Sequence, residues 1–235
     1  MGALYLIRHG QASYGEADYD RLSTRGVEQA HALGRQLATL KLDAVYAGPL
    51  RRQVQTIEYA TVAAEAIGIA LPPATLVPEL AEYPAFEMLQ HLVPRLVEDD
   101  PKFADLVNNP TPRLLDDAFK AVLGRWARDE WAVPGVERVT DFVTRVQTGL
   151  ERAIRNTTSG ARIAAVTSAG PIGVALGLVF QLAAERMVRT SVVVRNASIS
   201  ELKFRTADFA WDPDKISLVT FNNTGHLPPE LVSER

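Results

Sequence analysis

Residues 4–10 read Leu-Tyr-Leu-Ile-Arg-His-Gly, and this stretch decides how the rest of the sequence is interpreted. Its four apolar residues predict a buried strand, and the polar triplet that follows ends it. In a sheet with helices on its faces, ligands bind beyond the carboxyl ends of the strands. There, Arg8 offers a fork of donors for phosphate or carboxylate oxygens. His9 offers a nitrogen that titrates near neutral pH, and Gly10 leaves room for an anion at the backbone. The alternative is that Arg8 and His9 merely face water, because short matches of this kind are common.

The composition is that of an ordinary globular protein. The chain has 235 residues, 47% hydrophobic and 23% charged, enough for one α/β domain with a full core or for a domain with a cap. The formal net charge of -3 argues against a nucleic-acid partner or an anionic membrane surface. The absence of cysteine excludes disulfides, thiolate metal ligands and cysteine nucleophiles, and it fits a cytoplasmic location. We find no secretory signal and no apolar stretch long enough to span a bilayer.

Strands and helices alternate along most of the chain, which predicts a mainly parallel sheet. Apolar residues at helical spacing predict one helix that begins at Ser23 or Thr24 and another that begins at Leu50, each after a strand. A strand over residues 162–167 precedes a helix with Pro171 at its first position, running to about Leu182. We also expect a strand at 43–47, a helix from 139 to 154, and closing strands at 192–194, 199–204 and 216–221.

Residues 86–134 interrupt this alternation. Within them, residues 115–126 predict one amphipathic helix, whose apolar stripe needs a partner surface. We therefore expect one α/β domain over residues 1–235. Its central sheet is mainly parallel and flanked by helices on both faces, and a helical cap is inserted at about residues 86–134.

Polar residues also follow the next strand ends. Arg51 and Arg52 lie in the first turn of a predicted helix, beside unpaired backbone N–H groups. A bound anion would offset the unfavourable interaction of these cations with the helix dipole; otherwise they are solvated surface charges. Glu79 and Glu82 come after the following strand, and either carboxyl is suited to general acid catalysis if its pocket raises its pKa.

Three motifs in order give the chain a family resemblance. They are the Arg8-His9-Gly10 triplet, the helix start Leu22-Ser23-x-x-Gly26-x-x-Gln29-Ala30, and the run Leu50-x-Arg52-x-x-x-Thr56. With these motifs the chain resembles the histidine phosphatase superfamily, which includes cofactor-dependent phosphoglycerate mutases and many small-molecule phosphatases. The resemblance covers most of the chain apart from residues 86–134.

The resemblance implies roles for individual residues. His9 would be the nucleophile that carries the phosphoryl group during turnover. The phosphate ligands would be Arg8 and Arg52, with Gly10 leaving room at the backbone. Glu82 matches the family's proton donor better than Glu79 does. No metal ion or other cofactor is required for this chemistry.

One position departs from the family pattern. After the third strand the family usually has a second histidine, whereas this chain has Ser168, followed by Ala169. A hydroxyl is shorter than an imidazole and carries no positive charge. We therefore expect a slow phosphatase in which Ser168 still contributes to the phosphate pocket, directly or through a water. Ala169 and His226 are candidate additional ligands, and His226 either reaches the pocket or lies in a surface turn.

The leading hypothesis is a phosphomonoester phosphatase of small-molecule substrates that works through a phosphohistidine intermediate. A phosphoglycerate mutase is less well supported, because the residues after the triplet and after Glu82 differ from the mutase signatures. The third hypothesis is a non-catalytic protein that binds or senses a phosphate ligand on the same fold, for which Ser168 is the main support. In each case the expected ligand is a small phosphate ester or inorganic phosphate. The sequence predicts neither the physiological substrate nor the oligomeric state.

Overall fold

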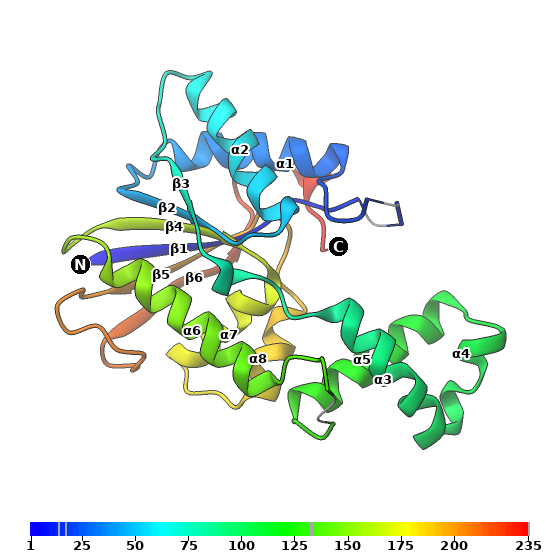
Figure 1. The fold of residues 1–235 in the computed structure, drawn as a ribbon. Coiled ribbons are helices and arrows are strands. Elements are labelled where there is room, and N and C mark those ends of the chain that lie inside the picture. The colour runs from blue at the N-terminus through cyan, green and yellow to red at the C-terminus, as the bar shows by residue number, and fades with distance from the viewer. Residues whose placement is uncertain (14, 17, 132–133, 235) are drawn as a thin grey trace.

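The computed structural model describes residues 1–13, 15–16, 18–131 and 134–234, and within these the strands form one six-stranded sheet (Figure 1). The strand order is β3-β2-β4-β1-β5-β6. The first four strands in this order pair in parallel, whereas β5 is antiparallel to β1 and β6 is antiparallel to β5. The strands are Gly2–Arg8 (β1), Ala44–Ala47 (β2), Ala74–Leu76 (β3), Arg162–Thr167 (β4), Ile199–Phe204 (β5) and Ile216–Asn223 (β6).

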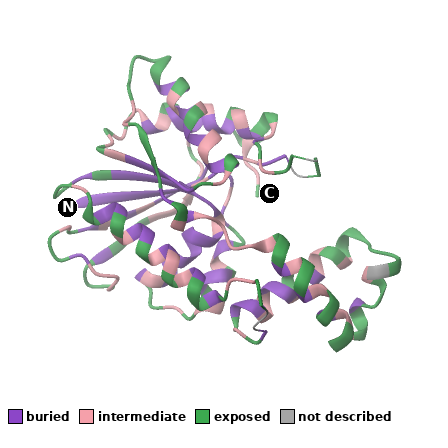
Figure 2. Ribbon diagram, in the orientation of Figure 1, coloured by how far each residue is buried: buried purple, intermediate pink, exposed green. Residues whose placement is uncertain are grey.

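Helices cover both faces of the sheet, so its central strands are buried (Figures 1 and 2). Side chains of β1 alternate between the faces: Tyr5 and Ile7 pack in one core cluster, and Leu4 and Leu6 in the other. The predicted α/β domain with a mainly parallel sheet and helices on both faces is thereby confirmed. One face carries Thr24–Leu37 (α1) and Arg51–Glu65 (α2), and the other carries Val139–Arg155 (α6), Ala169–Val179 (α7) and Ala184–Ser191 (α8).

The first helix begins where its sequence predicts. Ser23 is the N-cap of α1, and its hydroxyl oxygen accepts a hydrogen bond from the Gly26 N–H at 3.1 Å. Further along, α1 and α2 approach so closely that a β-carbon added to Gly34 would lie 2.1 Å from the Ala60 carbonyl oxygen. No side chain separates the two helices at this point, so their backbones are in direct contact.

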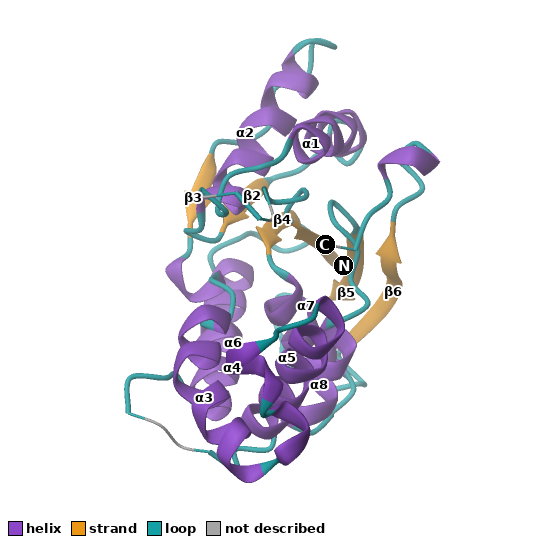
Figure 3. Cartoon of the chain, turned by 90° about the vertical axis from the view of Figure 1, so that its right-hand side faces the viewer, coloured by secondary structure: helices purple, strands orange, loops and turns teal. Residues whose placement is uncertain are grey.

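The segment between β3 and α6 forms a helical projection beyond the carboxyl ends of the strands (Figures 1 and 3). It begins with Ala85–Asp99 (α3), continues through the short helix Asp105–Asn108 (α4) and ends with Pro112–Ala127 (α5). The predicted apolar stripe lies on α5, where Val122 and Trp126 are buried in the same core cluster as α6 and α7. Residues 132 and 133, within the expected cap insertion, lie outside the described residues. In the described parts of the chain, no helix is long and apolar enough to cross a membrane.

Two local predictions near the end of the chain were wrong. Helix α7 begins at Ala169, so Pro171 is its third residue and not its first; proline is still tolerated there because first-turn N–H groups need no helical partner. Residues 192–194 form a turn instead of a strand, since Val192 is the C-cap of α8. Valine favours strands, but the preceding helix, which the sequence analysis missed, packs Met187 against Gly173 and Gly177 of α7 and so determines the local structure.

The close contact of α1 with α2 gives a stability prediction. Gly34→Ala should lower the free energy of unfolding by about 1–3 kcal/mol, because the added methyl group meets backbone and not a movable side chain. Gly124→Ala in α5 is the matched control, since its β-carbon would meet only the end of Arg128, at 3.5 Å. This substitution should stabilise the protein by up to about 1 kcal/mol through helix propensity. Urea unfolding of both variants checks the prediction, and equal effects would contradict it.

Candidate active site

The candidate site lies where the carboxyl ends of three adjacent strands meet. β4 lies between β1 and β2, and Arg8 is in register with Thr167. His9 follows β1, α2 begins shortly after β2, and Ser168 follows β4. The strand order therefore brings together the polar residues that the sequence analysis singled out after each of these strands.

His9 is held by a hydrogen bond at each ring nitrogen. Nδ1 lies 2.6 Å from the Gly10 carbonyl oxygen, and Nε2 lies 3.1 Å from Nε of Arg52. A carbonyl only accepts and a guanidinium only donates, so Nδ1 carries the proton and Nε2 presents its lone pair. Burial lowers the pKa of His9 well below its ordinary value, and the charges of Arg52 and Arg8 lower it further. The ring is therefore neutral at neutral pH, the form that a nucleophile requires.

Two guanidinium groups flank this imidazole. Arg52 lies in the first turn of α2, is 8% exposed and forms an ion pair with Asp20. Arg8 donates through Nη1 to the carbonyl oxygens of Val194 and, at 3.0 Å, Glu234. Its Nε is buried and has no hydrogen-bond partner among the residues that the structure describes. Burial lowers the pKa of Arg8, although the nearby Glu82 carboxyl acts in the opposite direction.

The Glu82 carboxyl interacts electrostatically with both arginines. Its two oxygens accept hydrogen bonds from the Gly170 N–H at 3.1 and 3.2 Å, and one also accepts from the Tyr83 N–H at 3.1 Å. Burial raises the pKa of Glu82, although the Gly170 N–H, Arg52, the Tyr83 N–H and Arg8 all act to lower it. A carboxyl with a raised pKa holds its proton to higher pH, as a general acid must.

The other candidate acid is occupied elsewhere. Glu79 forms an ion pair with Arg152 of α6. Burial acts to raise the pKa of Glu79, but the hydrogen bond from Arg152 and the charge of Arg145 lower it below its ordinary value. Of these two candidate acids, Glu82 is the one whose carboxyl interacts electrostatically with both Arg8 and Arg52.

Glycine at positions 10 and 170 is required by close contacts. A β-carbon on Gly10 would lie 2.6 Å from the Gly26 carbonyl oxygen, and the Gly10 N–H donates to the Thr56 hydroxyl at 2.9 Å. Gly10 therefore packs against the start of α1, and this contact alone requires a glycine at this position. At Gly170, a β-carbon would lie 2.0 Å from a Glu82 carboxylate oxygen. The absence of a side chain there lets the acid reach the N-terminus of α7.

Ser168 lies inside the protein. It is 0% exposed, and its hydroxyl oxygen accepts a hydrogen bond from Nε2 of Gln53 at 2.8 Å. Gln53 also donates to the Leu80 carbonyl at 3.2 Å and accepts from the Leu50 N–H at 3.0 Å. The sequence analysis did not single out Gln53, although glutamine at the third position of a helix is a known capping signal. Ala169, next to Ser168, is the first residue of α7.

His226 contacts the backbone that supports His9. Its ring forms a hydrogen bond with the backbone of Ala197, whose N–H in turn donates to the His9 carbonyl oxygen at 3.2 Å. Burial lowers the pKa of His226. Within the described residues, no contact joins its ring to Arg52 or Glu82.

No metal site accompanies these groups in the described part of the chain, where no cluster of three His, Cys, Asp or Glu side chains could hold an ion.

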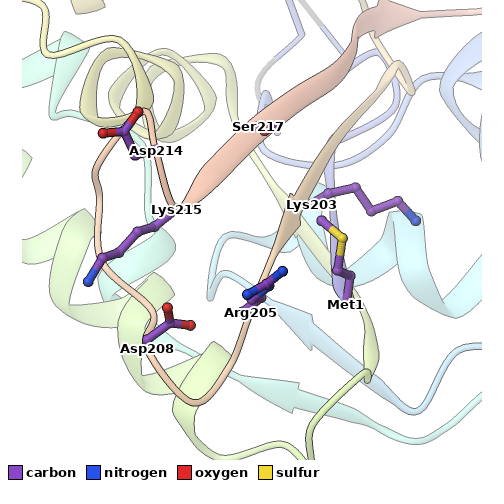
Figure 4. Close-up of a pocket in the computed structure, with 7 residues that line it drawn as sticks. All are labelled: Met1, Lys203, Arg205, Asp208, Asp214, Lys215 and Ser217. Carbon is purple, nitrogen blue, oxygen red and sulfur yellow. The ribbon is translucent and has the colours of Figure 1, made fainter.

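A surface pocket of about 260 Å³ lies at the opposite end of β1, between Met1 and the loop that joins β5 to β6 (Figure 4). The residues that line it include charges of both signs: Lys203, Arg205, Lys215, Asp208 and Asp214. This pocket is separate from the site around His9.

The fold and the candidate site together define a class of α/β proteins in which an imidazole, two arginines and a carboxyl group lie at the carboxyl ends of the strands. The sequence profile of the "Histidine phosphatase superfamily (branch 1)" matches residues 4–113 and 102–215. The chain therefore belongs to the histidine phosphatase superfamily. No curated protein sequence matches it.

Solved structures share this fold at low sequence identity. Phosphoserine phosphatase from Entamoeba histolytica, in complex with phosphoserine, has a TM-score of 0.59 at 19% identity, covering 97% of this chain and 100% of its own. Mycobacterial glucosyl-3-phosphoglycerate phosphatase has a TM-score of 0.62 at 19% identity, covering 94% and 98%. A phosphoglycerate mutase from Bacillus anthracis has a TM-score of 0.62 at 17% identity, covering 95% and 94%. At these identities the likeness establishes the fold.

The burial of Ser168 gives a prediction that separates two roles for it. Ser168→Ala should lower the free energy of unfolding by about 1–3 kcal/mol, because the Gln53 amide loses one of its two acceptors at a buried position. Ser198→Ala is the matched control: that hydroxyl is also 0% exposed but has no hydrogen-bond partner in the described residues. Denaturant unfolding and turnover are measured for both variants. Unchanged stability with lowered turnover in Ser168→Ala would instead indicate that Ser168 contacts the phosphoryl group.

Proposed function

We propose that this protein is a phosphomonoester phosphatase of small-molecule substrates, acting through a phosphohistidine intermediate on His9. The observation that carries the proposal is the state of the His9 ring: it is neutral, its Nδ1 proton is fixed on the Gly10 carbonyl, and Nε2 faces Arg52. A ring held in this way has one nucleophilic nitrogen in a fixed direction, next to a cation that attracts phosphate oxygens.

In the first step, Nε2 of His9 attacks the phosphorus atom in line with the ester bond. The N–P bond forms as the P–O bond to the leaving group breaks, and the protonated Glu82 gives its proton to the departing oxygen. In the structure without a substrate, Arg52 donates its Nε–H to Nε2 of His9. When the ester binds, Arg52 has to donate this N–H to a phosphate oxygen instead, which frees Nε2 for the attack. The negative charge of the phosphate favours that exchange.

In the second step, water attacks the phosphohistidine. The Glu82 carboxylate takes a proton from the water, the O–P bond forms, and the N–P bond breaks to regenerate neutral His9 and release inorganic phosphate. Arg8 and Arg52 stabilise the charge that spreads over the phosphoryl oxygens in both transition states. Burial of these groups strengthens each electrostatic interaction.

The proposed substrates are small phosphate monoesters. This rests on the names of two structural relatives, a phosphoserine phosphatase and a glucosyl-3-phosphoglycerate phosphatase. The helices α3 and α5 project from the edge of the sheet that carries the site, so we propose that residues 86–134 act as a cap that selects among such esters (Figure 3). The cytoplasm is the proposed location, since a chain without cysteine suits a reducing compartment.

Covalent labelling tests the nucleophile. Brief reaction with a phosphate-ester substrate or other phosphodonor should label His9 with phosphate that is lost in acid and retained in base, because an N–P bond behaves in this way. His9→Ala should be neither labelled nor active. Label on a serine, or label that persists in His9→Ala, would contradict the mechanism. An inactive wild-type protein that still binds inorganic phosphate would support the non-catalytic alternative.

The pH dependence of kcat/KM tests the acid. Because the proton of Glu82 is needed in the first step, activity should fall as the pH rises through the raised pKa of this carboxyl. Glu82→Gln should abolish this alkaline limb and slow alkyl phosphates by about 10²–10⁴-fold, with a smaller loss for aryl phosphates, whose leaving groups need the proton less. Glu79→Gln is the matched control and should keep the limb, since Glu79 is paired with Arg152. Loss of the alkaline limb in Glu79→Gln would instead identify Glu79 as the general acid.

A further inference from the structure

Two acidic residues of the loop after β1 contact two consecutive arginines at the start of α2. Asp18 forms an ion pair with Arg51, and Asp20 forms one with Arg52. The two pairs differ in their surroundings. The side chains of Asp18 and Arg51 are each 52% exposed, whereas the Arg52 side chain is only 10% exposed. The loop thus carries one ion pair at the surface and one at the candidate site.

Asp20 is itself anchored at both carboxylate oxygens. One oxygen accepts from Nη1 of Arg52, and the other accepts from the backbone N–H of Arg51 at 2.8 Å. The second hydrogen bond uses a first-turn N–H of α2, which has no helical partner. Asp20 is therefore fixed to the rigid end of a helix, and the Tyr19 ring lies 5.7 Å from the Arg52 guanidinium carbon.

Arg52 in turn is fixed relative to the nucleophile. Its Nη1 is directed to Asp20 and its Nε to Nε2 of His9, at 3.1 Å. Because a guanidinium is planar, two donors bound in these directions set the orientation of the whole group. A long side chain without such contacts would sample several rotamers and would have to be ordered each time an anion binds.

We infer that Asp20 is a positioning residue: through Arg52 it sets the orientation in which that guanidinium meets the His9 imidazole and the phosphoryl group. The inference rests on the proposed function of His9 as nucleophile. The sequence alone does not indicate this role, because nothing in it distinguishes Asp20 from Asp18 in the same loop. The Asp18 and Arg51 side chains hold the same loop, but in the described part of the chain neither forms a hydrogen bond or an ion pair with Arg52 or His9.

The test compares substitutions at the two loop acids. Asp20→Ala and Asp20→Glu should each lower kcat/KM for an aryl phosphate by about 10- to 100-fold, because displacing a catalytic group by about 1 Å costs about 100-fold. Asp20→Glu keeps the charge and moves the carboxylate by one methylene group, so it decides the question if Asp20→Ala fails to fold. Asp18→Ala is the matched control and should keep the wild-type kcat/KM. Thermal unfolding of each variant separates loss of activity from loss of fold.

A double substitution tests whether Asp20 acts through Arg52. In the Arg52→Ala background, adding Asp20→Ala should cause no further loss of kcat/KM, because the group that it positions is absent. A further loss equal to that in the wild-type background would overturn the inference. So would an Asp20→Glu variant with wild-type kcat/KM, or Asp20→Ala and Asp18→Ala variants that lose kcat/KM equally. His9→Ala separates a failure of this inference from a failure of the proposed function. If His9→Ala is inactive while Asp20→Glu keeps the wild-type kcat/KM, only the role of Asp20 is contradicted.

Discussion

The site depends on the hydrogen bond that Arg52 donates to the buried imidazole of His9. The Gly10 carbonyl takes the proton at Nδ1, so Nε2 can only accept, and the adjacent guanidinium charge disfavours protonation of the ring. A buried histidine that carried a charge here would lie beside two other cations. The neutral ring is therefore a consequence of its surroundings, and the same surroundings collect the positive charge that a phosphate dianion would neutralise.

This arrangement requires the backbone to approach side chains more closely than most residues permit. Gly10 packs on Gly26 where β1 meets α1, and Gly170 lies against the Glu82 carboxylate at the start of α7. In both places an added β-carbon would lie closer than 3 Å to an oxygen. The distances between the groups of the site are thus fixed by backbone contacts, which are stiffer than contacts between flexible side chains.

The sequence was sufficient for the architecture because alternation of strands and helices is a local pattern. The same reasoning placed Arg8, His9 and Arg52 at one sheet edge, since residues that follow neighbouring parallel strands must meet there. It failed where the determining contact is distant in the chain. The turn at 192–194 depends on how α8 packs on α7. The contacts of Ser168 with Gln53 and of Asp20 with α2 also join residues that are far apart in the chain, and no local pattern indicates them.

The hydrogen bond from Arg8 to the carbonyl of Glu234 joins residues 226 positions apart. Asn196 bonds to Ser233 in the same region, so the arginine of the first strand is anchored by some of the last residues described. During synthesis, β1 leaves the ribosome long before Glu234 exists. A nascent chain that has not yet reached Glu234 therefore contains His9 without the fully anchored Arg8 beside it. The anchoring of Arg8 thus depends on residues made 226 positions later, and a cleavage of the chain before Ser233 would remove this hydrogen bond.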